Sequence, residues 1–122
     1  MGKRDDRLRS PAEFQQILKT RPVSRSGAFV IYQISCEQGP RLGFVLPKKL
    51  VRTAVCRNQI KRWARALFRH PTSFVSPESS RLAMVVRVNT RMTKEQFKPL
   101  QRDATRFQLF SAMKKAFQNP SA

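Results

Sequence analysis

Apolar residues recur at helical intervals in the most basic part of the chain, residues 46–70. Their spacing predicts a helix whose buried side carries Cys56, Ile60, Trp63, Ala64 and Leu67. At about 100° per residue, the opposite side carries Asn58, Lys61, Arg62, Arg65 and Arg69. Arg57 and Phe68 fall near the borders between the two sides. The helix should end before Pro71, because proline has no N–H with which to continue it.

A second helix is predicted near the start of the chain. Ser10 can cap it, Pro11 suits its first position, and Glu13 can complete a capping box. This helix should end near Thr20, because an arginine and a proline follow. Its apolar stripe consists of Phe14, Ile17 and Leu18.

A third helix is predicted at about residues 98–117, after a short turn at 93–97, because Pro99 conflicts with an earlier start. Apolar residues keep helical spacing along it, which is typical of an apolar helix face. They are Leu100, Ala104, Phe107, Phe110 and Phe117.

Strands are predicted on both sides of the basic segment. Residues 28–35 alternate, with Phe29, Ile31 and Gln33 on one face and Val30, Tyr32 and Ile34 on the other. Residues 41–46 should pair with them as an antiparallel hairpin through a turn at 37–40, whereas 24–27 indicate a polar loop. The almost wholly apolar stretch 82–88 is typical of a central strand covered on both faces.

The order strand, basic helix, strand indicates a crossover connection within one sheet. We therefore predict an α/β (α+β) fold in one small domain over residues 1–122, with frayed ends at about 1–8 and 119–122. The chain has no internal repeat, and nothing in its pattern indicates a second domain.

The net charge of +18, from 25 Lys and Arg against 7 Asp and Glu, predicts a polyanionic partner. That partner is nucleic acid or an anionic membrane surface. No apolar run approaches the roughly 18 residues of a membrane span, and residues 1–10 lack the apolar stretch of a signal peptide. We therefore expect a cytoplasmic protein.

Candidate catalytic groups are sparse. His70 is the only histidine, and its place at a predicted helix end is typical of a surface or capping group. The seven acidic residues are scattered, so the pattern does not predict a protein-held pair of metal ions. By itself the chain is poorly equipped for catalysis, and binding is the better hypothesis.

Several residues are suited to binding RNA. Lys48 and Lys49 precede the basic helix and extend its cationic surface. Asn58 can bond a base or ribose edge, or it can fix the backbone at the start of the helix. Aromatic side chains at Phe14, Phe29 and Tyr32 can stack on unpaired bases, or they can belong to the core.

The segment AVCRNQIKRWARALFR resembles the basic motif of the bacterial ribonuclease P protein component, and the preceding GFVLPKKL resembles that family's strand with its terminal Lys pair. The order of elements matches over nearly the whole chain. The resemblance implies a mostly antiparallel sheet packed with helices and a left-handed strand–helix–strand crossover at the basic helix. It also implies a protein subunit, monomeric in the holoenzyme, that assists Mg²⁺-dependent endonucleolytic removal of the 5′ leader from precursor tRNA.

The resemblance also implies roles for individual residues. The residues expected to contact the catalytic RNA subunit are Arg57, Asn58, Lys61, Arg62, Arg65 and Arg69. The residues expected to bind the single-stranded leader are Phe14, Phe29, Tyr32, Lys48 and Lys49. In that family the RNA subunit holds the catalytic Mg²⁺ ions, so no catalytic or metal-binding residue is expected in this chain. Arg87 aligns less clearly with a leader-binding position.

Three positions depart from the family pattern. Gln59 replaces an arginine of the Arg-Asn-Arg core, Ala66 replaces a glutamate, and Leu18 occupies a place that is often aromatic. Three other classes of protein are left open by charge alone: another RNA-binding module such as a ribosome-associated protein, a stand-alone nuclease, and a membrane-surface protein. The first of them shares the charge and the size but not the basic motif.

Overall fold

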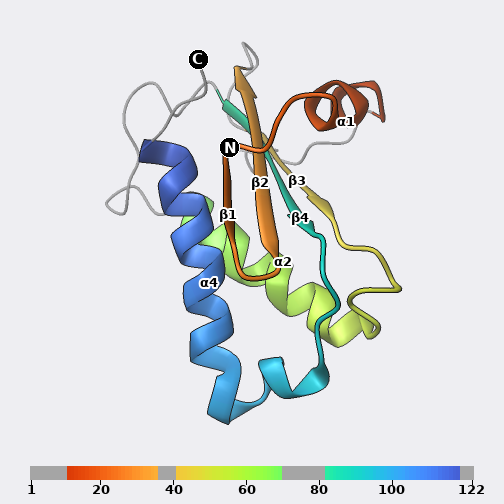
Figure 1. Ribbon diagram of the computed structural model, residues 1–122, viewed down its shortest axis with the longest axis vertical. Helices are drawn as coiled ribbons and strands as arrows, with labels where there is room; N and C mark the ends of the chain where they lie inside the picture. Colours follow the sequence, from red (N-terminus) through yellow and green to blue (C-terminus); the bar gives the residue numbers. More distant parts are fainter. Residues whose placement is uncertain (1–10, 36–40, 70–81, 119–122) are drawn as a thin grey trace, which may run out of the picture.

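The computed structural model describes residues 11–35, 41–69 and 82–118, and a four-stranded sheet lies at its centre (Figure 1). The strands are β1 (Ser24–Ser26), β2 (Phe29–Ser35), β3 (Arg41–Val45) and β4 (Leu82–Val88), in the spatial order β1-β2-β4-β3. The β1–β2 and β2–β4 pairs are antiparallel and the β3–β4 pair is parallel. The predicted fold class and mostly antiparallel sheet are confirmed.

The predicted hairpin between the second and third strands is wrong. β3 pairs with β4, which lies between β3 and β2. The physical reason is burial: residues 83–86 and Val88 are at most 1% exposed, so β4 needs a neighbour on each edge and cover on both faces. The turn predicted at 37–40 lies outside the described residues.

The parallel β3–β4 pair requires a crossover, and α2 (Ala54–Arg69) provides it. This confirms the connection predicted from the order strand, basic helix, strand. The left-handedness that the resemblance implies stays a prediction.

The segment predicted as a polar loop at 24–27 contains the short edge strand β1. Its Ser-Arg-Ser sequence carries no hydrophobic signal, and a hydrogen bond from the Ser24 hydroxyl to the carbonyl oxygen of Ala112 ties it to the last helix. Gly27 joins β1 to β2 with a φ of +57°, a backbone conformation that residues other than glycine rarely adopt. A Cβ atom there would also collide with the Gln108 side chain.

Helices cover both faces of the sheet. α2 and α4 (Pro99–Gln118) lie on one face with the larger core, and the 3₁₀ turn η2 (Lys94–Phe97) precedes α4. α1 (Pro11–Leu18) lies on the other face, where Ile17 packs on a smaller core (Figure 1). The residues of that smaller core are Ile17, Val30, Tyr32, Ala83 and Val85. Ser10, the predicted cap of α1, lies outside the described residues.

α4 buries a different side from the one indicated by its apolar spacing. Leu100 is 99% exposed and Phe107 is 64% exposed, and Ala104 is exposed as well. The buried residues are Thr105, Leu109, Ala112, Met113 and Ala116.

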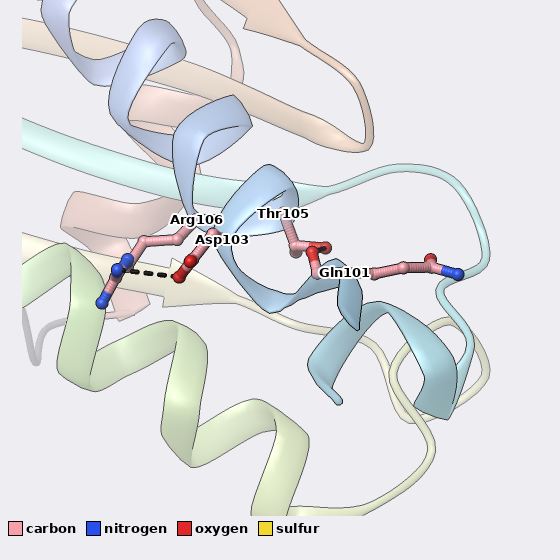
Figure 2. A network of polar contacts seen from close by, with 4 residues as sticks. All are labelled: Gln101, Asp103, Thr105 and Arg106. Carbon is pink, nitrogen blue, oxygen red and sulfur yellow. Dashed lines mark hydrogen bonds and ion pairs between the residues drawn. The ribbon is translucent and has the colours of Figure 1, made fainter. Parts of the chain in front are cut away.

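Two features of the buried side explain this orientation of α4. Its alanines allow the helix to approach the sheet closely. Its one polar member, Thr105, shares its single hydroxyl proton between the carbonyl oxygens of Gln96 (2.6 Å) and Gln101 (3.1 Å), so burial leaves no unpaired hydroxyl. Thr105 and Gln101 lie one turn apart on α4 (Figure 2).

Candidate nucleic-acid interface

The start of α2 is fixed by backbone and side-chain hydrogen bonds. The carbonyl oxygen of Pro47 accepts bonds from the N–H groups of Leu50 and Val51, both at 2.9 Å. Thr53 caps the helix, because its hydroxyl oxygen accepts a bond from the N–H of Cys56 at 3.2 Å. Lys48 and Lys49 are exposed within this turned segment, as a cationic approach to the helix requires.

The apolar side of α2 is buried as predicted. Ile60 and Ala64 are 0% exposed, and Cys56 and Trp63 belong to the same core. Phe68, expected near the border, is also buried, whereas Leu67 is only half-buried. The ring of Trp63 stacks on that of Phe97, with centroids 5.8 Å apart and planes 11° apart. These contacts hold the helix in one orientation on the sheet.

The opposite side of α2 presents cations to solvent. Asn58 and Arg62 are exposed, and Lys61 and Arg65 are half-buried. These four residues, with Ala66, line one shallow depression of the surface. No acidic residue occurs in the 16-residue helix, so no carboxylate within it offsets these charges. Arg69 lies at the last position of α2, and its side chain is outside the described part of the structure.

Arg57 has a local contact that the sequence did not indicate. Its Nη1 atom donates to the carbonyl oxygen of Val51 at 2.7 Å, and the residue is half-buried. The guanidinium therefore holds the turn before α2 against the first turn of the helix. Its contact with RNA stays a prediction, and the other guanidinium nitrogens would have to make it.

Tyr32 lies on the α1 face of the sheet, although it is only 7% exposed. Its hydroxyl accepts a hydrogen bond from Arg87 Nη1 at 3.3 Å. The Nε atom of Arg87 is buried and has no hydrogen-bond partner within the described part of the chain. This cross-strand pair depends on the β2–β4 register, in which Tyr32 lies opposite Val85 and Arg87 lies opposite Val30. Sequence reasoning singled out Arg87 only weakly because that register could not be read from the chain.

Phe29 does not share a cleft with Tyr32, so the prediction that both line one leader-binding surface is wrong. Phe29 is 0% exposed and belongs to the core beneath α2 and α4, on the opposite face of the sheet. The reason is the two-residue period of a strand, which sends positions three apart to opposite faces. Phe14 lies in α1, on the Tyr32 side, and its side chain is outside the described part of the structure.

The possible metal ligands and the helices of the described residues limit which functions this surface can have. Within residues 11–35, 41–69 and 82–118, no three His, Cys, Asp or Glu side chains come together as metal ligands would. In the same part of the chain, no helix is long and apolar enough to cross a membrane. What the described residues do assemble is a fixed cationic helix beside a mixed sheet.

Comparison with known proteins identifies the family. The profile of the Ribonuclease P family matches residues 2–116. The ribonuclease P protein component of Burkholderia mallei (strain SAVP1) is 36% identical over 89 residues, which cover 73% of this chain and 62% of the relative. The chain thus spans less than two thirds of that relative's length.

Solved structures agree with the sequence comparison. The RNase P protein of Staphylococcus aureus matches with a TM-score of 0.65 at 26% identity, over 93% of this chain and 96% of that protein. The RNase P protein of Thermotoga maritima matches with a TM-score of 0.62 at 27% identity, over 89% and 96%. The predicted resemblance is confirmed, and the chain belongs to the ribonuclease P protein family.

Proposed function

We propose that this chain is the protein subunit of bacterial ribonuclease P, and that α2 binds the catalytic RNA. The observation that carries the proposal is the division of α2 into a largely buried apolar side and a cationic side without carboxylates. Because the buried side fixes the helix, Lys61, Arg62 and Arg65 meet phosphates without a large further loss of conformational freedom. Arginine adds forked donors that match phosphate oxygens.

The chemistry in this proposal belongs to the RNA subunit. Mg²⁺ held by that RNA would supply the hydrolysis of the phosphodiester bond. The protein would lower the repulsion between the phosphates of RNA and substrate, and this lowering favours both substrate binding and metal occupancy. The described residues suit that role, because they bring many cations and no carboxylate cluster to the surface.

The α1 face of the sheet is our proposed site for the single-stranded leader of precursor tRNA. Tyr32 and Arg87 lie on this face, and Arg87 pairs in register with Val45 at the end of β3. The exposed Lys48 and Lys49 follow shortly after Val45, so they add positive charge near the end of β3. Arg87 is half-buried, and its Nε has no hydrogen-bond partner among the described residues.

Phe14 completes this proposal as a stacking residue on α1. The protein would act as a monomer within a cytoplasmic ribonucleoprotein. We test the leader site by comparing affinities for precursor tRNA and mature tRNA in the assembled holoenzyme. Phe14→Ala should weaken precursor binding more than mature tRNA binding, whereas equal losses would make Phe14 a packing residue.

The stand-alone nuclease is the alternative that a simple assay separates. Purified protein without RNA should leave precursor tRNA intact in the presence of Mg²⁺. Robust cleavage by the protein alone would contradict the proposal, because it would place the chemistry in this chain.

A further inference from the structure

An open groove of about 670 Å³ runs between α2 and α4, next to the depression that holds Asn58 and Lys61, with which it shares Arg62 and Ala66. The residues that α2 contributes are Gln59, Arg62, Trp63, Ala66 and Leu67. The residues that α4 contributes are Arg102, Asp103, Arg106, Phe107 and Phe110. The groove therefore combines aromatic rings with guanidinium groups, and no part of the proposed function uses its α4 wall.

Phe107 is the unusual residue of this groove, because it is 64% exposed. Its ring lies 6.3 Å from that of Phe110 at an angle of 34°, so the two rings form one apolar surface. The buried side of α4 is fixed by Leu109 and Met113, both 0% exposed, so Phe107 cannot turn into the core. A large aromatic held in solvent next to a groove is typical of a binding surface.

The charges of the groove favour a polyanion. Arg62 and Arg102 are exposed, and Arg106 Nη2 pairs with Asp103 Oδ1 at 2.9 Å (Figure 2). Figure 2 shows Asp103 and Arg106 leaving α4 on the side where α2 runs. The groove thus has three guanidinium groups and one carboxylate.

We propose that this groove binds an unpaired nucleobase of the RNA that lies along α2. The base stacks on Phe107, and Arg62 and Arg102 contact the flanking phosphates. Asp103 repels a phosphate but accepts an N–H from a base edge, while Arg106 donates to a carbonyl or ring nitrogen of the base. The inference rests on the proposed function for the presence of RNA along α2.

A second copy of this chain is the competing occupant, and the charge disfavours it. Two molecules of net charge +18 repel each other, and the groove itself carries an excess of arginine. A nucleotide instead provides both a flat ring for Phe107 and a phosphate for the arginines. The two occupants differ in measurable ways.

The test uses the intact protein and two short single-stranded oligoribonucleotides, one of them abasic at its central positions. Phe107→Ala should lower affinity for the base-bearing oligonucleotide about 5- to 150-fold, equivalent to ~1–3 kcal/mol for one stacked base, and should leave the abasic affinity unchanged. Leu100→Ala is the matched control, because Leu100 is 99% exposed on the same helix and does not line the groove. It should change neither affinity.

Conservative variants separate stacking from apolar contact. Phe107→Tyr should keep the affinity for the base-bearing oligonucleotide, whereas Phe107→Leu should lose it. Trp63, the only tryptophan of the chain, lines the groove, so its fluorescence should change when the base-bearing oligonucleotide binds. Full affinity in Phe107→Leu, or equal losses on both oligonucleotides, would overturn the proposal.

One further pair of measurements separates this inference from the proposed function. Arg65 lies on α2 outside the groove, so Arg65→Gln should weaken both oligonucleotides equally if α2 binds phosphates. If Arg65→Gln lowers the affinities and Phe107→Ala does not, the nucleobase site in the groove is refuted and the proposed function stands. If Arg65→Gln has no effect, the result counts against the proposed function. Sedimentation that shifts from dimer to monomer in Phe107→Ala would instead assign the groove to self-association and overturn the nucleobase site.

Discussion

The guanidinium of Arg65 lies over the ring of Phe44, with its Cζ atom 5.6 Å from the ring centroid. Arg65 belongs to the cationic side of α2, and Phe44 belongs to β3 and packs against the larger core. The contact therefore links the sheet to one of the proposed RNA-binding cations. A cation over an aromatic face is attracted by the ring and held in one region of space.

Phe44→Leu should lower affinity for the RNA subunit by about 0.5–1 kcal/mol, the usual strength of such a contact at an exposed site. The reason is that the arginine loses the ring that orients it. The measurement is RNA binding by Phe44→Leu in the natural background and in an Arg65→Gln background. The effect should disappear in the second background, and equal effects in both would show that Phe44 acts through packing.

Removal of charge from α2 should change the salt dependence of RNA binding. The double variant Arg62→Gln and Arg65→Gln should flatten the slope of log affinity against log salt by about 0.7–0.9 for each phosphate that the protein no longer neutralises. Lys115→Gln is the matched control, because Lys115 is exposed on α4 and lines neither the groove nor the depression on α2. An unchanged slope in the double variant would contradict a phosphate-binding role for α2.

The Tyr32–Arg87 pair predicts an effect confined to substrates that carry a leader. Tyr32→Phe removes the hydroxyl that accepts from Arg87, so precursor tRNA affinity should fall by about 0.5–1.5 kcal/mol, the usual value for one hydrogen bond. Mature tRNA affinity should stay the same. Phe29→Leu, on the opposite face, should lower stability without changing the ratio of the two affinities. A changed ratio in Phe29→Leu would contradict the division of the sheet into two faces.

The two sides of α2 should differ sharply in stability measurements. Ile60→Ala should lower the free energy of unfolding by about 2–5 kcal/mol, because it leaves a cavity in place of the Ile60 side chain, which is 0% exposed. Asn58→Ala, on the exposed side, should change it by less than about 0.5 kcal/mol. Chemical denaturation of both variants checks this, and similar losses would mean that α2 packs in another orientation.

Local periodicity predicted most of the fold. The division of α2 and the alternation along β2 follow from spacing alone, because a helix and a strand repeat with fixed periods. The apolar stretch of β4 predicted a central strand, but periodicity could not show that β3 lies beside β4 and not beside β2. The orientation of α4 was also beyond the pattern, because apolar residues occur on more than one of its sides.

The residues of the candidate site also differ in how far local periodicity could place them. Lys61, Arg62 and Arg65 could be placed on one surface from their spacing, and the structure agrees. Phe29 was assigned to a binding cleft by resemblance, against the alternation that already separated it from Tyr32. The groove beside Phe107 could not be foreseen, because it requires knowing which apolar residues of α4 are left exposed.

Reconstitution with a bacterial ribonuclease P RNA tests the central claim most directly. At a Mg²⁺ concentration too low for that RNA to act alone, the natural protein should restore cleavage of precursor tRNA at the mature 5′ end. The variant with Arg62→Gln and Arg65→Gln should need a higher protein concentration for the same rate. If the natural protein failed to stimulate the RNA, or if it cleaved precursor tRNA without the RNA, its proposed role as the RNA-binding subunit of ribonuclease P would be contradicted.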